Sequence, residues 1–170
     1  MKRIVCALTI IVLLLCTAWS AASASRMKAS GTTCTAVGEA TWTPPINVSH
    51  IRPTAISHVA TLTCRGGGVL VGALAGFLRS HKVACVAAPK TTPEAGALTI
   101  QWNTGASSKI SVRVTFVNGT GHQILSGKVT SGLFKGDTVK YDLQARQPQV
   151  GHCTDAAPLV STSYDASVTL

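Results

Sequence analysis

The chain has 170 residues, of which 46% are hydrophobic and 12% are charged, with a formal net charge of +9. This length favours a single domain that is large enough to bury a core. The positive charge favours association with anionic surfaces, but the sequence has no dense Lys/Arg cluster interleaved with aromatic residues, which argues against nucleic-acid binding.

Residues 1–24 have the features of a secretory signal peptide. Lys2 and Arg3 form a positive start, Ala7–Trp19 is mostly apolar, and small residues precede a cut at Ser25. A membrane anchor is the alternative, but the apolar run is shorter than the ~20 residues of a membrane span. We therefore expect a secreted, extracellular protein whose single domain is 25–170 and whose net charge without Lys2 and Arg3 is +7.

Four cysteines follow the leader, namely Cys34, Cys64, Cys85 and Cys153. An even number in an exported chain indicates two disulfides, with three pairings open. We favour Cys64–Cys85, which brackets one local excursion, and Cys34–Cys153, which links the first strand to the segment before the last. A zinc site is disfavoured because the chain has no C-x-x-C pair.

The first half of the domain alternates apolar and polar residues in Cys34–Trp42 and again in Ile56–Cys64, which predicts two strands. Pro44-Pro45 is expected to end the first of them. The run Val69–Leu78 is apolar on both parities and fits a buried strand or a short helix. Its flanking glycines and β-branched residues favour a strand paired with Lys82–Ala87.

The second half, from Ala97 to Arg146, reads as four successive strands separated by polar and glycine-containing turns. Tyr164–Leu170 alternates in the same way and predicts a closing strand. The whole domain then has eight or nine antiparallel strands. An apolar sheet face needs a covering layer, so we predict an all-β, two-sheet sandwich of the immunoglobulin-like type.

Four features together resemble a group of small secreted proteins of actinobacteria. They are an early cysteine strand at Cys34, the Thr99-Ile100-Gln101-Trp102 hairpin, the Gly-Leu-Phe-x-Gly-Asp turn at 132–137, and the late Cys153. The resemblance implies an immunoglobulin-like β-sandwich of unknown function, and it brings no catalytic residues. The run Val69–Leu78 departs from it by being more apolar.

No constellation of residues points to catalysis. The six acidic residues are scattered, the histidines lack metal-site spacing, and G-x-S-x-G is absent. His58 shares parity with Ile56 and Leu62, which favours a core histidine over a ligand. We expect a protein that is not an enzyme and has no cofactor, no metal and no transmembrane segment after the leader is removed.

Two surfaces are candidates for binding. The outward residues Lys109, Arg113, Lys140 and Arg146, with Lys128 near them, could form a basic stripe for an anionic cell-wall polymer or a membrane surface, although a plain solvated face is the simpler interpretation. An apolar patch for a protein partner is the second candidate, with core burial as its simpler interpretation. Its residues would be Leu74, Phe77, Leu78, Leu133 and Phe134.

These observations favour a secreted, non-catalytic binding or interaction module at the bacterial cell envelope. The alternative is a secreted inhibitor or effector that acts through an exposed loop such as Pro89–Gly96. A hydrolase ranks third, because it would need acidic or histidine side chains that converge in one pocket.

Overall fold

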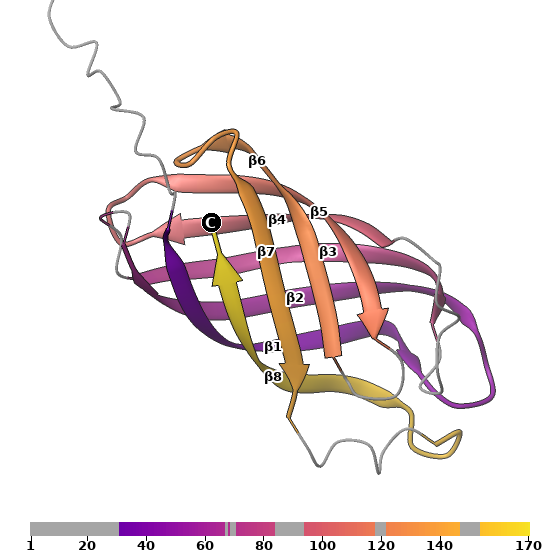
Figure 1. Cartoon of the computed structure of the whole chain (residues 1–170). Helices are drawn as coiled ribbons and strands as arrows, with labels where there is room; N and C mark the ends of the chain where they lie inside the picture. The colour runs from indigo at the N-terminus through magenta and orange to yellow at the C-terminus, as the bar shows by residue number, and fades with distance from the viewer. Residues whose placement is uncertain (1–30, 67, 69–70, 84–93, 118–121, 147–153) are drawn as a thin grey trace, which may run out of the picture.

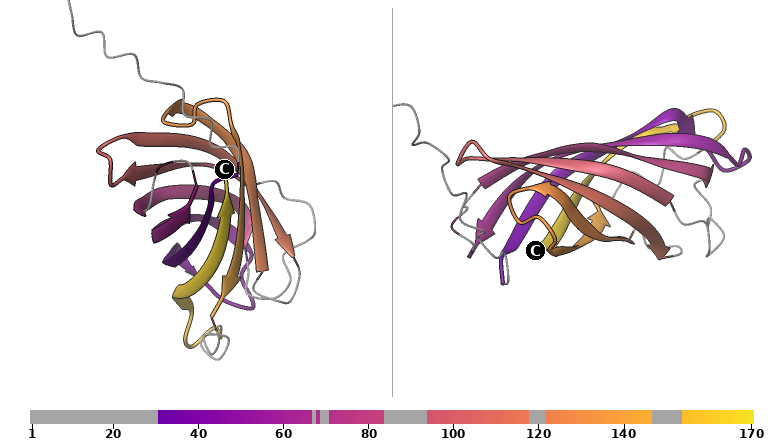
Figure 2. Two further views of the ribbon diagram at one scale, coloured as in Figure 1. Left: turned by 60° about the vertical axis from the view of Figure 1, so that its left-hand side comes forward. Right: turned by 90° about the horizontal axis from the view of Figure 1, so that it is seen from above.

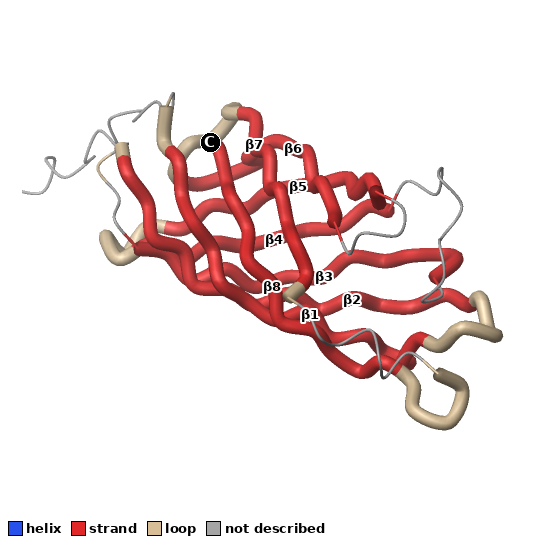
Figure 3. Tube along the Cα trace, turned by 60° about the horizontal axis from the view of Figure 1, so that its bottom comes forward, coloured by secondary structure: helices blue, strands red, loops and turns tan. Residues whose placement is uncertain are grey.

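The computed structural model describes residues 31–66, 68, 71–83, 94–117, 122–146 and 154–170. The predicted signal peptide lies outside these ranges. Every regular element of the described part is a strand (Figure 3). The strands are β1 (Thr33–Ile46), β2 (Arg52–Arg65), β3 (Val71–Val83), β4 (Glu94–Trp102), β5 (Ser107–Val117), β6 (His122–Gly132), β7 (Thr138–Ala145) and β8 (Leu159–Thr169).

The eight strands form a closed barrel in which each strand pairs antiparallel with its neighbour along the chain (Figures 1 and 2). Strand β8 pairs with β1 and closes the ring. The all-β prediction is confirmed, but the expected two-sheet sandwich is replaced by a barrel, so the immunoglobulin-like type is not confirmed. Both architectures give strands with one apolar face, because a barrel covers that face by closing the sheet on itself.

Strand β3 does not form the predicted hairpin between Val69–Leu78 and Lys82–Ala87. It runs without a turn from Val71 to Val83, and it pairs with β2 on one side and β4 on the other. Leu74 and Leu78 are buried inside the barrel, whereas Phe77 is 66% exposed on the outside. The segment is apolar on both parities because its outer face also carries apolar side chains.

Strand β1 continues through Pro44 and Pro45, where we expected it to end. The peptide bond Thr43–Pro44 is cis, and pairing with β8 shifts register between Thr41 and Ile46. Proline has no N–H for the ladder, so it is tolerated where the pairing is already irregular. The two prolines therefore interrupt the ladder within the strand.

The disulfide of the described region joins Cys34 to Cys64. Both predicted pairings, Cys34–Cys153 and Cys64–Cys85, are therefore wrong. Cys34 and Cys64 lie directly opposite each other on the neighbouring strands β1 and β2, and both side chains point into the barrel. Cys85 and Cys153 lie outside the described residues.

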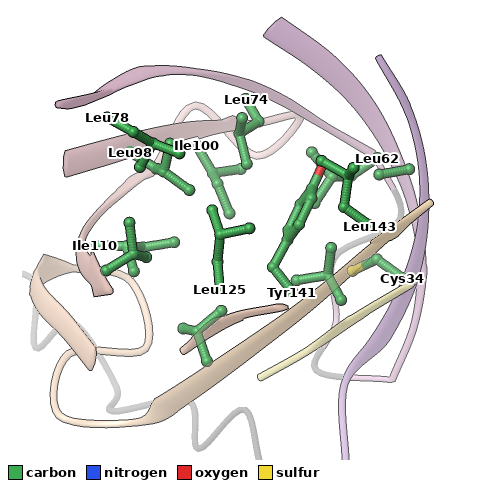
Figure 4. Packing of buried hydrophobic residues seen from close by; sticks show 14 of the residues in the cluster. Cys34, Leu62, Leu74, Leu78, Leu98, Ile100, Ile110, Leu125, Tyr141 and Leu143 are labelled. Carbon is green, nitrogen blue, oxygen red and sulfur yellow. The ribbon is translucent and has the colours of Figure 1, made fainter. Parts of the chain in front are cut away.

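The barrel interior is filled by side chains from all eight strands, with Tyr141 projecting among Leu62, Leu125 and Leu143 (Figure 4). An eight-stranded barrel has an interior of about the width that side chains can fill. The residues predicted to face inward on the strands therefore form the core.

The turn between β6 and β7 packs against the end of β4 and the start of β5. Phe134 adopts a φ of 64° and packs edge-on against Trp102, with ring centroids 5.6 Å apart. The Trp102 Nε1–H donates to Ser108 Oγ at 2.8 Å, and that hydroxyl donates to the Leu133 carbonyl at 2.6 Å. The Gly-Leu-Phe-x-Gly-Asp turn therefore has a structural role. Phe134 belongs to the core and not to the exposed apolar patch that was its alternative.

Candidate functional site

The outer face of β5, β6 and β7 gathers four basic side chains, which we call the basic face: Lys109, Arg113, Lys128 and Lys140. All four are exposed. The register places Arg113 and Lys140 on either side of Ser126, and it places Lys128 opposite Ser111, midway between Lys109 and Arg113 along β5. The structure thus brings together three of the four predicted contact residues, and Lys128 lies among them, where it was expected.

The three lysines of the basic face lie on one diagonal. Lys109 is on β5, Lys128 on β6 and Lys140 on β7. At each step to the next strand the position moves two residues along the strand direction. Strands are about 4.8 Å apart and alternate residues about 6.7 Å apart, so successive lysine positions are about 8 Å apart. Exposed hydroxyl groups fill the places between them, at Ser111, Ser126 and Thr138.

The basic face is only partly neutralised. Lys140 Nζ lies 3.4 Å from Asp142 Oδ2, and His122 Nε2 lies 2.5 Å from the other oxygen. The hydrogen bond with His122, followed by the nearby positive charges, lowers the pKa of Asp142. None of the ion pairs found between described residues involves Lys109, Arg113 or Lys128.

Arg146 is placed apart from the other basic residues. It follows the end of β7, six residues beyond Lys140, which corresponds to about 20 Å along an extended chain. Its guanidinium binds Asp165 through two hydrogen bonds, Nε to Oδ2 at 2.7 Å and Nη2 to Oδ1 at 2.5 Å. This pairing lowers the pKa of Asp165 and raises that of Arg146, so Arg146 already has an anionic partner.

A second polar cluster lies inside the barrel and was only partly predicted. His58 is 2% exposed, its ring centroid is 5.6 Å from that of Tyr164, and its Nε2 has no hydrogen-bond partner. The Tyr141 hydroxyl donates to Tyr164 Oη at 3.3 Å, and that hydroxyl donates to the Val59 carbonyl at 3.4 Å. The core position predicted for His58 is confirmed.

Burial controls the ionisation of this cluster. It lowers the pKa of His58 to about 4, so the imidazole is neutral at pH 7. Burial also raises the pKa of Tyr141, to which the neighbouring Tyr164 contributes, and it raises the pKa of Tyr164. Tyr141 and Tyr164 have inward parity in the sequence, but only the pairing of β7 with β8 shows that they meet.

Among the described residues, a serine, a histidine and an aspartate come together at the loop after β1. Asp155 accepts hydrogen bonds from the backbone N–H and the hydroxyl of Ser49, and its Oδ1 lies 4.0 Å from His50 Nδ1. The same imidazole nitrogen is 3.3 Å from Asn47 Nδ2. A serine nucleophile needs a base such as imidazole to accept its proton, and here the hydroxyl contacts a carboxylate instead. This contact ties the loop to the segment before β8.

Metal sites and membrane-spanning helices were sought in the described part of the chain. No group of three or more His, Cys, Asp or Glu side chains there could hold a metal ion. The described ranges also contain no helix of the length and apolarity that crossing a membrane requires.

Fold and surface together define a class: an antiparallel eight-stranded barrel with a filled core, a disulfide between its first two strands and a basic outer face. Comparison of the chain with protein-family models, with curated proteins and with solved structures found no match.

Proposed function

We propose that the protein is a secreted, non-catalytic binding module of the bacterial cell envelope, and that its basic face binds an anionic envelope polymer. The observation that carries the proposal is the gathering of Lys109, Arg113, Lys128 and Lys140 on one face, where Asp142 is the acidic group paired with them among the described residues. The features of a signal peptide in residues 1–24 support export.

The geometry suits an extended polyanion better than a compact ligand. The lysine diagonal offers positive charges about 8 Å apart on an exposed sheet surface, with hydroxyl donors between them. A flexible chain with repeated negative charges can meet several of these lysines at once. Lysine binds a phosphate or carboxylate group as a mobile point charge, so no enclosed pocket is required.

The test is binding of the mature chain, residues 25–170, to poly(glycerol phosphate) and to isolated cell-wall sacculi. We expect the triple variant Lys109→Gln, Lys128→Gln, Lys140→Gln to bind at least tenfold more weakly than the wild type. The plot of log affinity against log salt should become shallower by about 2, because each lost phosphate contact removes roughly 0.7–0.9 of slope.

A charge-matched control is the triple variant Arg65→Gln, Lys135→Gln, Arg146→Gln, which removes the same net charge from other parts of the surface. It should retain most of the affinity and of the salt slope. Equal weakening in the two triple variants would show that net charge rather than the basic face is responsible. Absence of binding by the wild type to both probes would refute the proposed function.

A further inference from the structure

The outer face of β1, β2 and β3 exposes an apolar patch, which we call the apolar face. Its large side chains are Val37 at 52% exposure, Val59 at 51%, Val71 at 42% and Phe77 at 66%. The register places three of them on one diagonal: Val37 lies opposite Thr61, two residues from Val59, and Val59 lies opposite Ala75, two residues from Phe77. Val71 lies apart from this diagonal, opposite Thr63. Single exposed apolar residues are common, but a contiguous group indicates an interaction surface.

The apolar face has little net charge. The outward-facing set of residues 33–43 of β1, 55–65 of β2 and 71–79 of β3 has three charged residues: Glu39 lies opposite Val59, and Arg65 and Arg79 lie at the two edges of the face. Their sum is +1, and the other residues of the set are Thr, Ser, Ala, Val and Phe. The neighbouring segment of β4, residues 95–101, carries no charged residue. Strand β8 adds Asp165, which is already bound to Arg146.

The apolar face and the basic face lie on opposite sides of the barrel. In a closed ring of eight strands, β2 and β6 are four places apart in either direction. The basic face has four basic residues and Asp142, a net charge of +3, and is therefore the more positive of the two faces.

We infer that a second copy of this chain covers the apolar face, in a two-fold symmetric dimer. A two-fold interface brings a surface against itself, so that surface must not carry a large charge of one sign. Contact through the basic faces would oppose like charges, whereas contact through the apolar faces keeps the basic faces farthest apart. The charge distribution therefore selects this face for self-association.

The size of the face predicts a weak dimer. Strand spacing of about 4.8 Å and a rise of about 3.3 Å per residue give the three strands a footprint of about 400 Å², and β4 and β8 curve away from it around the closed barrel. A standard interface buries about 800 Å² on each partner. We expect a dissociation constant in the micromolar range, so the dimer should dissociate on dilution.

The experiment is sedimentation equilibrium of the mature chain from low micromolar to several hundred micromolar concentration, without polyanion. The wild type should pass from monomer to dimer. Phe77→Lys and Val59→Glu should raise the dissociation constant at least tenfold, because each brings two like charges into the two-fold contact, beside Arg79 and Glu39 respectively. Both positions are exposed, so the thermal unfolding midpoint should stay close to that of the wild type.

Ser126→Lys is the matched control for Phe77→Lys, because it adds the same charge to the basic face and should leave dimerisation unchanged. A wild type that stays monomeric throughout, or a Phe77→Lys variant that dimerises like the wild type, would overturn the inference. Phe77-dependent binding of a monomeric wild type to phosphatidylcholine vesicles would also overturn it, in favour of a lipid surface on this face.

Discussion

At the level of single residues, His58 shows how a polar side chain is tolerated in the barrel interior. It is 2% exposed and its Nε2 has no partner. A buried polar group without a hydrogen bond is unfavourable, and a buried charge is more unfavourable still. The neutral form is therefore retained, and the pKa of His58 falls to about 4.

This pKa makes the stability of the fold depend on pH between about 6.5 and 4. An unfolded chain binds a proton at His58 near pH 6.5, whereas the folded chain binds it only near pH 4. Protons therefore favour the unfolded state in this interval, and stability falls as the pH is lowered. Full protonation should remove about 3 kcal/mol of unfolding free energy, measurable by urea denaturation at pH 7 and at pH 4.

The variant His58→Leu separates this effect from the other titrations of the protein. Between pH 7 and pH 4 this variant should lose about 3 kcal/mol less unfolding free energy than the wild type does. At pH 7 it should be about as stable as the wild type, because no existing Nε2 hydrogen bond is removed. His50→Gln is the control, since the His50 side chain is 70% exposed. It should keep the pH dependence of the wild type. Equal losses in the wild type and in His58→Leu would contradict the role of His58.

At the level of strands, much of the fold was predictable from alternation. The hairpin of β4 with β5 forms as expected, with Leu98 opposite Ile110, and the parity of Lys109, Arg113 and Lys140 places each of them outside. Alternation identifies the two faces of a strand but not its neighbours. The pairing of β1 with β8, which turns the expected sandwich into a barrel, depends on segments far apart in the sequence.

Register explains the remaining differences in the candidate site. Lys128 was expected near the other basic residues, and the register gives its exact position, opposite Ser111 and beyond an irregularity after Lys109. Arg146 leaves the stripe because β7 pairs with β8, which brings Asp165 within reach of its guanidinium. The disulfide was missed for the same reason, since Cys34 and Cys64 become neighbours only when β1 and β2 pair.

The pairing of β1 with β2 makes the Cys34–Cys64 disulfide a test of both register and stability. The two cysteines are 30 residues apart, and in the chain-entropy model a loop of that length contributes about 3–4 kcal/mol. The double variant Cys34→Ala, Cys64→Ala should lose about this much unfolding free energy. Non-reducing peptide mapping of the wild type should give a peptide linked through Cys34 and Cys64. A Cys34–Cys153 or Cys64–Cys85 peptide would contradict the register.

For the whole molecule, the two outer faces have consequences that neither has alone. A dimer through the apolar faces would carry two basic faces directed away from each other, because the faces lie on opposite sides of each barrel. Such a particle can bind two polymer chains at once. Two linked sites also bind one surface more tightly than a single site does, by an amount that depends on their geometry.

We therefore expect the wild type to cross-link poly(glycerol phosphate) at protein concentrations above its dimer dissociation constant. As polymer is added, the turbidity of the solution should rise and should then fall again when polymer is in excess. Phe77→Lys should still bind the polymer but should produce little turbidity, since each monomer has one basic face. The lysine triple variant should still dimerise, but it should neither bind the polymer nor produce turbidity. Strong turbidity with Phe77→Lys would show that a single barrel already binds two polymer chains. It would contradict the expectation that cross-linking requires the dimer.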